Sequence, residues 1–158
     1  MRNLNELNIN EGGRLVARSA PLVADIKSFE ASFGIRLPKS YITFLNHSNG
    51  GHPELDTFAP IKGDNGNTWA VNRFYFLDSD HSTSGGLWQV QNDWKDVLGP
   101  KSVPIASDSG GNQIVLDFNS CEDGEVKLCI HDRAFKMISI APSFDSFINL
   151  LSEDPDMI

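Results

Sequence analysis

Three side chains in the middle of the chain have the types and spacing of a small metal site. Asp78, Asp80 and His81 form the pattern D-x-D-H, which could place two carboxylates and an imidazole around a hard cation such as Mg²⁺ or Mn²⁺. Their segment, residues 78–86, reads DSDHSTSGG, and loops also gather Asp, Ser and His for turn chemistry alone. A metal-dependent enzyme would need a further acidic ligand to meet these three. We therefore interpret the segment as a solvated loop and expect no bound metal and no cofactor.

A second stretch has the composition of an anion-binding loop. Residues 107–112 read SDSGGN, and successive backbone N–H groups near glycines can bind phosphate. The Lys-Ser or Lys-Thr ending of a P-loop is missing, and a strand pattern rather than a helix follows. We predict a structural turn, in which Gly110 and Gly111 supply unusual backbone angles and Asn112 hydrogen-bonds the loop's own backbone.

Cys129 and His131 are two residues apart, which would place both on one face of a strand. The pair resembles half of a metal site, or a nucleophile with its base. No second pair completes either arrangement, so we predict a packed cysteine beside a surface histidine. The second cysteine, Cys121, could reach Cys129 if the two lie on one hairpin. The missing apolar export signal favours free thiols and a cytoplasmic protein.

The charge of the chain is distributed unevenly. The formal net charge is −8, and residues 53–132, with five basic and thirteen acidic side chains, account for the whole excess. No run of Lys or Arg offers the footprint that nucleic-acid binding needs. No stretch approaches the ~18 apolar residues of a membrane helix. The sequence therefore indicates neither nucleic acid nor membrane as a partner.

An acidic segment of this kind raises the rate of association with a basic protein. The alternative is that the negative charge only keeps the protein soluble. We predict that the segment supplies a partner-binding surface made of loop acids and one aromatic anchor. The candidate residues are Asp64, Trp69, Asp78, Asp80, Glu122 and Asp123.

Two helices are predicted upstream of these loops. In the first, the apolar residues Leu22, Ile26, Phe29 and Phe33 recur at helical spacing and predict one buried stripe. Ser19 as a capping residue and Pro21 in the first turn would begin this helix, and Gly34 would end it. The second helix is predicted from Pro38 to about Asn46.

The rest of the chain alternates short strands with two more helices. Strands are predicted at residues 54–60, 71–77, 103–106, 113–118, 125–131 and 136–140, and helices at 87–98 and from Pro142 to about Leu151. In the helix at 87–98, Trp94 is assigned to the buried stripe, and Val97 supports the helical pattern. Helices at both ends of a run of strands predict a single α+β domain, with a mainly antiparallel twisted sheet and helices from both chain ends packed against it. We divide the chain into an N-terminal arm (1–19), this domain (20–151) and a C-terminal tail (152–158).

Two blocks of the sequence match the signature of a known family. Around the second helix the chain reads G-I-x-L-P-x-x-Y-x-x-F-L and then N-G-G, and residues 103–118 read VPIASDSGGNQIVLDF. Both blocks resemble the SUKH superfamily, which includes fungal cell-wall-assembly regulators and many bacterial immunity proteins. The characteristic positions, which we interpret as architectural, fall on Leu37, Pro38, Tyr41, Phe44, Leu45, Asn49, Gly50, Gly51, Gly110, Gly111, Asn112 and Asp117.

The resemblance implies a non-enzymatic binding protein. In many bacterial members this is an immunity protein that neutralises a cognate toxin, often a nuclease, by direct binding. The missing catalytic set and the acidic middle segment agree with that expectation, and a basic nuclease domain is the expected partner. A regulatory scaffold similar to the fungal members is the alternative, although those tend to carry long low-complexity flanks. A metal-dependent hydrolase at Asp78, Asp80 and His81 is the third hypothesis.

Overall fold

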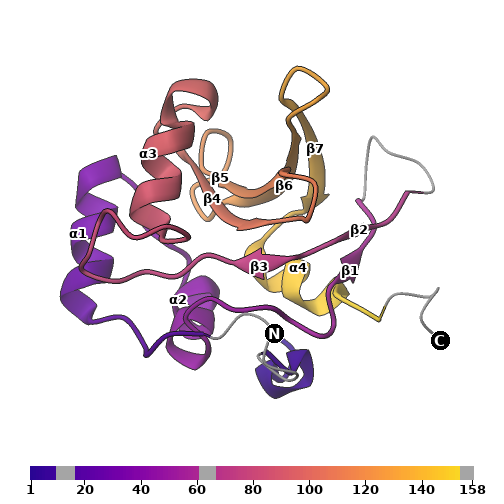
Figure 1. Ribbon diagram of the computed structural model, residues 1–158, viewed down its shortest axis with the longest axis horizontal. Helices are drawn as coiled ribbons and strands as arrows, with labels where there is room; N and C mark the ends of the chain where they lie inside the picture. The colour runs from indigo at the N-terminus through magenta and orange to yellow at the C-terminus, as the bar shows by residue number, and fades with distance from the viewer. Residues whose placement is uncertain (10–16, 61–66, 154–158) are drawn as a thin grey trace.

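A five-stranded antiparallel sheet with the order β3-β4-β5-β6-β7 forms the centre of the molecule (Figure 1). The computed structural model describes residues 1–9, 17–60 and 67–153. The strands of the sheet are β3 (Arg73–Phe74), β4 (Ser102–Ser107), β5 (Gln113–Asp117), β6 (Glu125–Ile130) and β7 (Lys136–Ala141). A separate antiparallel ribbon pairs β1 (Thr57–Phe58) with β2 (Trp69–Ala70). The helices are η1 (Leu4–Leu7), α1 (Val23–Phe33), α2 (Lys39–His47), α3 (Leu87–Leu98) and α4 (Phe144–Leu150). The predicted α+β fold with a mainly antiparallel sheet is confirmed.

The two faces of the sheet differ in chemistry. Ile114 and Leu116 of β5 belong to the hydrophobic core, which also contains side chains of all four α-helices. Val115 lies between them and is fully buried, but outside this core, because successive side chains of a strand point to opposite faces. Asp117 shares the face of Val115, and Lys127 is the residue of β6 that pairs across from Val115. One face therefore holds the helices, and the other carries polar groups.

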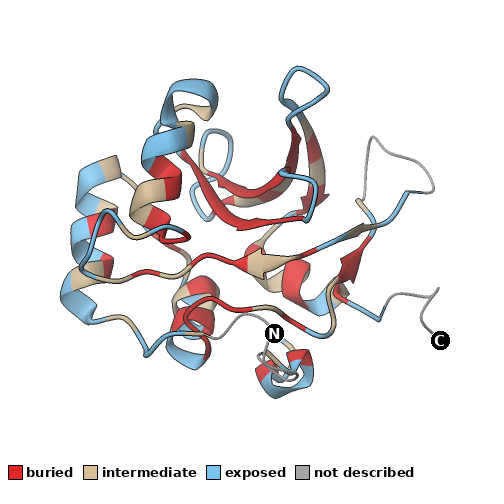
Figure 2. Ribbon diagram, in the orientation of Figure 1, coloured by how far each residue is buried: buried red, intermediate tan, exposed pale blue. Residues whose placement is uncertain are grey.

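The helices α2 and α4 bring the two ends of the domain together. The ring of Phe44 on α2 lies 4.6 Å from the ring of Phe74 on β3 and 5.5 Å from that of Phe144 on α4. Helix α4 also contacts β6 and β7. Figure 2 shows the inward sides of α2 and α4 buried. The prediction that helices from both chain ends pack on the sheet is therefore confirmed.

Helix α1 packs on a different part of the same core. Phe29 and Phe33 contact the indole of Trp88 on α3, with ring centroids 5.2 and 5.8 Å apart. Gly34 ends α1 with a φ of 63°, the left-handed backbone that glycine adopts readily. The predicted C-terminal end of α1 is confirmed.

The start of α1 differs from the prediction. The helix begins at Val23 with Leu22 as its N-cap, so the predicted roles of Ser19 and Pro21 are wrong. Ser19 is held outside the helix because the Asn49 amide donates to its carbonyl oxygen at 2.9 Å. Leu22 is also 65% exposed rather than part of the buried stripe, since it precedes the first helical turn.

The predicted strand at residues 71–77 is reduced to the two residues of β3. Its backbone binds several segments instead of one neighbouring strand. Phe74 N–H donates to Gly51 O, Tyr75 N–H to Ile105 O, and Leu77 N–H to the side chain of Asn49. A continuous ladder cannot form where the partner changes from residue to residue.

Helix α3 covers the predicted residues 87–98. Trp94 is half-buried and packs against the core, so its predicted place on the buried stripe is confirmed in part, whereas Val97 is 47% exposed. At the N-terminal end of the chain, Leu4 and Leu7 of η1 belong to the hydrophobic core. Within the described residues, no helix has the length and apolar character needed to cross a membrane.

Candidate functional site

Asn49 joins two segments that are distant in sequence and form the candidate site. Its side-chain amide donates to Ser19 O at 2.9 Å and to Leu77 O at 2.8 Å, and its Oδ1 accepts from Leu77 N–H at 2.8 Å. Its own carbonyl accepts from Arg18 N–H at 2.9 Å. Asn49 is 1% exposed, so these bonds form out of water. They hold residues 17–22 alongside residues 77–79.

The residue after Asn49, Gly50, lies in close contact with the segment at Phe74 and Phe76. Its φ is 93°, and a Cβ built there would lie 3.1 Å from Phe76 Cβ and 3.3 Å from Phe74 O. A larger residue would therefore meet both backbone strain and a close contact. In the N-G-G sequence after α2, the asparagine side chain therefore hydrogen-bonds two distant segments, and the first glycine fits closely against Phe74 and Phe76.

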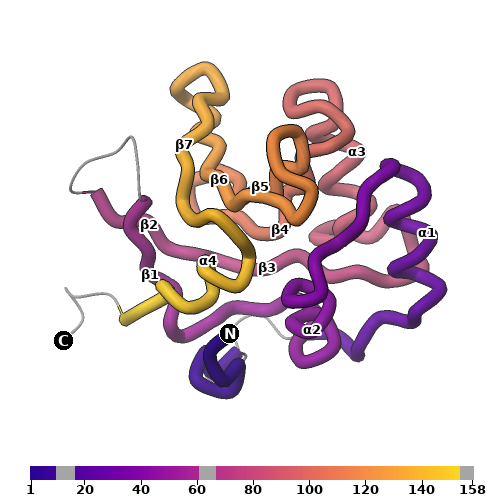
Figure 3. The backbone as a smooth tube through the Cα atoms, turned by 180° about the vertical axis from the view of Figure 1, so that it is seen from behind, coloured from indigo at the N-terminus to yellow at the C-terminus, as the bar shows by residue number. Residues whose placement is uncertain are grey.

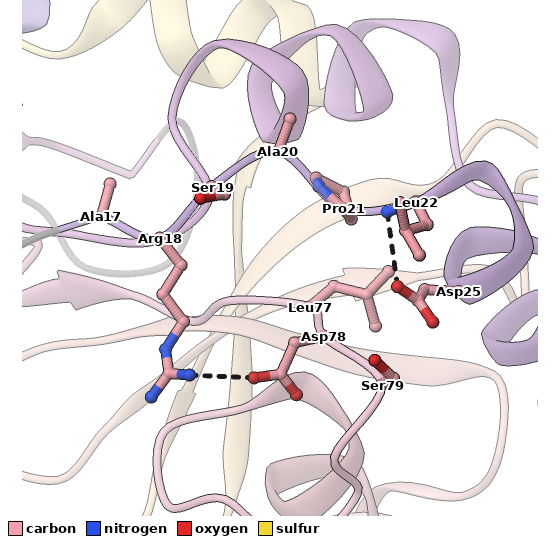
Figure 4. A pocket seen from close by; sticks show the side chains of 10 residues that line it. All are labelled: Ala17, Arg18, Ser19, Ala20, Pro21, Leu22, Asp25, Leu77, Asp78 and Ser79. Carbon is pink, nitrogen blue, oxygen red and sulfur yellow. Dashed lines mark hydrogen bonds and ion pairs between the residues drawn. The ribbon is translucent and has the colours of Figure 1, made fainter.

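A pocket of about 520 Å³ lies between the two segments that Asn49 joins (Figure 4). Residues 17–22 form one wall and residues 77–79 the other, and Asp25 of α1 contributes at the rim. The Arg18 guanidinium donates to Asp78 Oδ2 at 2.9 Å and lies 3.9 Å above the ring of Phe76. This ion pair connects the two walls.

Carboxylates outnumber cations around this pocket. Asp25 accepts a hydrogen bond from Leu22 N–H at 3.3 Å and lies in the first turn of α1, where the helix dipole favours negative charge. Asp80 follows Asp78 in the loop and is fully exposed. Hydrogen bonds from the backbone and side chain of Ser82 lower the pKa of Asp80. Among the described residues, two carboxylates, those of Asp25 and Asp78, and one guanidinium, that of Arg18, line the pocket, and Asp80 follows in the adjoining loop.

The same region presents apolar side chains to solvent. Residues 20–24 read Ala-Pro-Leu-Val-Ala, and Leu22 and Val23 are 65% and 67% exposed. We call these five residues the apolar segment. Helical spacing places Leu22 on the buried stripe, so sequence reasoning missed this surface. The uninterrupted run of five apolar residues before the helix was the signal that could have revealed it.

The SDSGGN loop is closed by its own aspartate. Asp108 Oδ1 accepts from Gly110 N–H at 2.9 Å and Asn112 N–H at 2.8 Å, and Asp108 Oδ2 accepts from the Asn112 amide. Asn112 Oδ1 accepts from His131 N–H. The N–H groups of Gly110 and Asn112, which a phosphate could otherwise use, are thus bound inside the loop. The predicted bond from the Asn112 side chain to the loop's own backbone is therefore wrong: this side chain bonds the Asp108 carboxylate and the backbone of His131.

The sequence signature of the SMI1 / KNR4 family (SUKH-1) matches residues 21–150, the region of the predicted resemblance. The chain belongs to this family. It is also similar to the SPbeta prophage-derived uncharacterized protein YokK of Bacillus subtilis (strain 168). The two are 26% identical over 148 residues, which cover 82% of this chain and 74% of that protein.

Most SMI1/KNR4 signature positions lie inside the fold. Of the twelve positions named above, Pro38 is half-buried, Gly110 and Gly111 are exposed, and the other nine are buried.

Asp117 binds Lys127 Nζ at 2.7 Å and accepts from Asn119 N–H at 2.9 Å. Burial raises the pKa of Asp117, but the hydrogen bonds from Lys127 and Asn119 and the charge of Lys127 outweigh it, so that the pKa lies below its usual range.

The D-x-D-H residues of this SMI1/KNR4 protein point to separate partners. Asp78 pairs with Arg18, Asp80 accepts from Ser82 N–H at 2.9 Å, and the ring of His81 stacks 3.6 Å from that of Trp88. Within the described residues, no three His, Cys, Asp or Glu side chains gather as they would around a metal ion. The arrangement is that of an ordered turn.

Cys129 and His131 do not form a reactive pair. Cys129 is buried on β6, and burial raises the pKa of its thiol, so the reactive thiolate is disfavoured. His131 lies beyond the end of β6, which corrects the predicted strand end, and its Nε2 lies 2.7 Å from Gly110 O. Both cysteines are free, with Cys121 exposed in the β5–β6 turn.

The remaining predicted contact residues lie elsewhere. Glu122 and Asp123 of the β5–β6 turn are exposed and face the segment between α1 and α2 (Figure 3). Arg36, Lys39 and Lys101 line the same two pockets as this turn, so the acids of the turn have basic neighbours. Trp69 on β2 is half-buried and packs against the core, and Asp64 lies outside the described residues.

Proposed function

We propose that this SMI1/KNR4 protein is a non-enzymatic immunity protein that binds and neutralises a basic bacterial toxin domain. The observation that carries the proposal is that several of its acidic side chains are exposed to solvent and form no ion pair. Asp80, Asp93 and Asp96 are all exposed, and none of the three joins an ion pair within the described parts of the chain. Exposed and unpaired carboxylates leave their negative potential available to a partner.

The comparisons connect the chain with a bacterial relative, which agrees with the bacterial setting of the proposal. The relative from Bacillus subtilis is prophage-derived by its name, although no activity is attached to it. A nuclease is the expected toxin class, because a protein that binds the phosphate backbone is basic and would complement an acidic surface.

The test is co-expression of this chain with the toxin domain encoded beside its gene. We expect cells that make both proteins to survive and cells that make the toxin domain alone to die. The purified proteins should form a stoichiometric complex, and toxin activity should fall in proportion to the amount bound. Failure of the complete chain to protect, when it is present in excess of the toxin, would refute the proposal.

The proposal that this chain is not an enzyme has a separate test. Because Asp78, Asp80 and His81 each contact a different partner, we expect no specific binding of Zn²⁺ or Mg²⁺ in calorimetry and no phosphoester hydrolysis. A stoichiometric metal site that Asp78→Ala or His81→Ala abolishes would instead favour the hydrolase. His131→Ala, which changes an exposed histidine elsewhere, is the matched control.

A further inference from the structure

The apolar segment, residues 20–24, has a composition that folding does not explain. Single exposed apolar residues are ordinary on protein surfaces, but an exposed run of several is unusual unless a partner covers it. The buried residues of α1 are Ile26 and Phe29, so the helix packs on the core without Leu22 or Val23. These two side chains, 65% and 67% exposed, add apolar surface that the fold leaves in water.

Leu22 also occupies a position where its residue type is unfavourable. It is the N-cap of α1, and its side chain makes no capping hydrogen bond. Ser, Thr, Asp and Asn are strongly preferred at this position, whereas Leu is among the poorest choices. A residue that weakens its own helix and remains exposed is better explained by a contact outside the chain.

The surroundings of the segment indicate the chemistry of that contact. Leu22 lines the pocket of about 520 Å³, which is large enough to receive a side chain of a partner. Asp25 and Asp78 line the same pocket, and exposed Asp80 follows in the loop. An apolar surface with carboxylates at its edge fits a protein that presents an apolar side chain flanked by Lys or Arg.

We infer that the apolar segment and the loop at residues 77–80 form the docking surface for the basic toxin domain. This assignment rests on the proposed function and specifies where it is carried out. Apolar contacts at Leu22 and Val23 hold the complex together, and Asp80 binds a cation of the toxin. Arg18 remains paired with Asp78, and this ion pair keeps the two walls of the pocket in place.

The other acidic candidate is less suited to a basic partner. Glu122 and Asp123 line pockets with Arg36, Lys39 and Lys101. The nearby basic groups reduce the negative potential of these acids, and the described residues that line these two pockets include none of the large exposed apolar side chains. The turn therefore provides matched control positions for the docking surface.

Apolar contacts are tested with serine variants, using the complete chain and an inactive variant of the toxin domain encoded beside it as the probe. Leu22→Ser removes the apolar side chain but introduces a favoured N-cap, so the melting temperature should stay or rise while the complex dissociates about tenfold faster or more. Val23→Ser should act in the same direction. Val97→Ser, at the other large exposed valine, is the control and should leave both rates unchanged.

Charge is tested with amides. Asp80→Asn keeps an oxygen that accepts from Ser82 but removes the charge, and we expect weaker binding at physiological salt. Asp123→Asn makes the same change in the β5–β6 turn and should bind normally. Amide hydrogen exchange gives an independent map, in which toxin binding should protect residues 20–25 and 77–82 more than residues 119–124.

The outcomes separate the two proposals. If the unchanged chain gives no protection from the toxin, the immunity function fails and the docking assignment fails with it. If the chain protects, but Leu22→Ser and Asp80→Asn bind as tightly as their controls, the function stands and this surface is wrong. Sedimentation that shows a dimer of the free chain, converted to monomer by Leu22→Ser, would also overturn the assignment, because the segment would then bind a second copy.

Discussion

At the scale of single residues, Asn49 shows how one buried amide can position a surface. Its donor and acceptor groups bind the backbone at Ser19 and Leu77, which are 30 residues before it and 28 after it. A hydrophobic residue of similar size could fill the space but could not satisfy Leu77 N–H, which would then be left buried without a partner. Asn49, one of the positions that the resemblance assigned to the family signature, thus holds the two walls of the candidate site together.

Asn49→Ala should therefore lower the free energy of unfolding by about 1–3 kcal/mol, the usual effect of leaving a buried polar group unpaired. Denaturant melts measure this loss. Asn46→Ala, at an exposed position near the end of α2, should stay within about 0.5 kcal/mol of the unchanged chain. Equal losses for the two variants would contradict the role given to Asn49.

Asp117 and Lys127 form a second residue-scale feature, on the polar face of the sheet. Their contact lowers the pKa of Asp117 and raises the pKa of Lys127. The carboxylate therefore contributes stability above the usual carboxyl pKa and loses it as the pH falls through the lowered folded-state pKa. The ammonium contributes stability below the usual lysine pKa and loses it as the pH rises through the raised value. Both contributions are present from about pH 4 to pH 10.

Asp117→Asn should reduce the free energy of unfolding at pH 7 by about 1.5–3 kcal/mol, the range for hydrogen bonds to charged groups. The difference from the unchanged chain should shrink as the pH falls from about 4 through the lowered folded-state pKa of Asp117, below which both proteins carry a neutral group at this position. Thermal melts from pH 2 to pH 7 test this. Asp96→Asn, at an exposed position of α3, should show no comparable change, and a constant difference for Asp117→Asn across this range would contradict the ion-pair account.

At the scale of elements, the structure is held by aromatic contacts between helices and the sheet. Tyr41 and Phe44 of α2 meet Phe144 of α4, with ring centroids 5.0 and 5.5 Å apart. Phe44 also contacts Phe74. One ring therefore connects three elements from the beginning, middle and end of the chain.

Phe44→Ala should destabilise the protein by about 3–5 kcal/mol, the usual cost of truncating a fully buried phenylalanine. The residue is 0% exposed, and its neighbours come from several elements that cannot collapse together into the space. Urea unfolding measures the effect. Thr43→Ala, at the exposed preceding position of α2, is the control, and a loss below about 1 kcal/mol for Phe44→Ala would contradict this packing.

Elements that depend on local periodicity were predictable from the sequence. Helix α3 has the predicted bounds, and β4 to β7 lie within a residue or so of their predicted positions, because their apolar patterns repeat within short windows. The start of α1 and the length of β3 depend instead on hydrogen bonds to Asn49, Gly51 and Ile105. Such partners are distant in sequence, so no local sequence pattern predicts these hydrogen bonds.

The candidate site was predictable only in part for the same reason. Asp78 and Asp80 do lie at its pocket or in the adjoining loop, but the Arg18 partner of Asp78 is 60 residues away in sequence. Likewise, the acidic pair Glu122 and Asp123 lies among basic residues that come from other parts of the chain. Charge totals by segment could not reveal which acids have basic neighbours in space.

At the scale of the whole molecule, the net charge of −8 has a role distinct from that of the docking surface. Long-range attraction raises the association rate with a basic toxin domain, whereas contacts within the complex set the dissociation rate. Charges outside the contact area therefore change mainly the association rate. Salt weakens them because the screening length is about 8 Å at physiological ionic strength.

Reversal of Glu122 and Asp123 to lysine tests this separation. Each change raises the net charge by two, so the double variant carries −4 instead of −8, while the apolar segment and Asp80 are untouched. We expect association with the inactive toxin domain to slow several-fold at low ionic strength and to approach that of the unchanged chain as salt is added. Dissociation should not change, in contrast to Leu22→Ser. Stopped-flow measurements at several salt concentrations give both rates, and faster dissociation of the double variant would place the β5–β6 turn inside the interface.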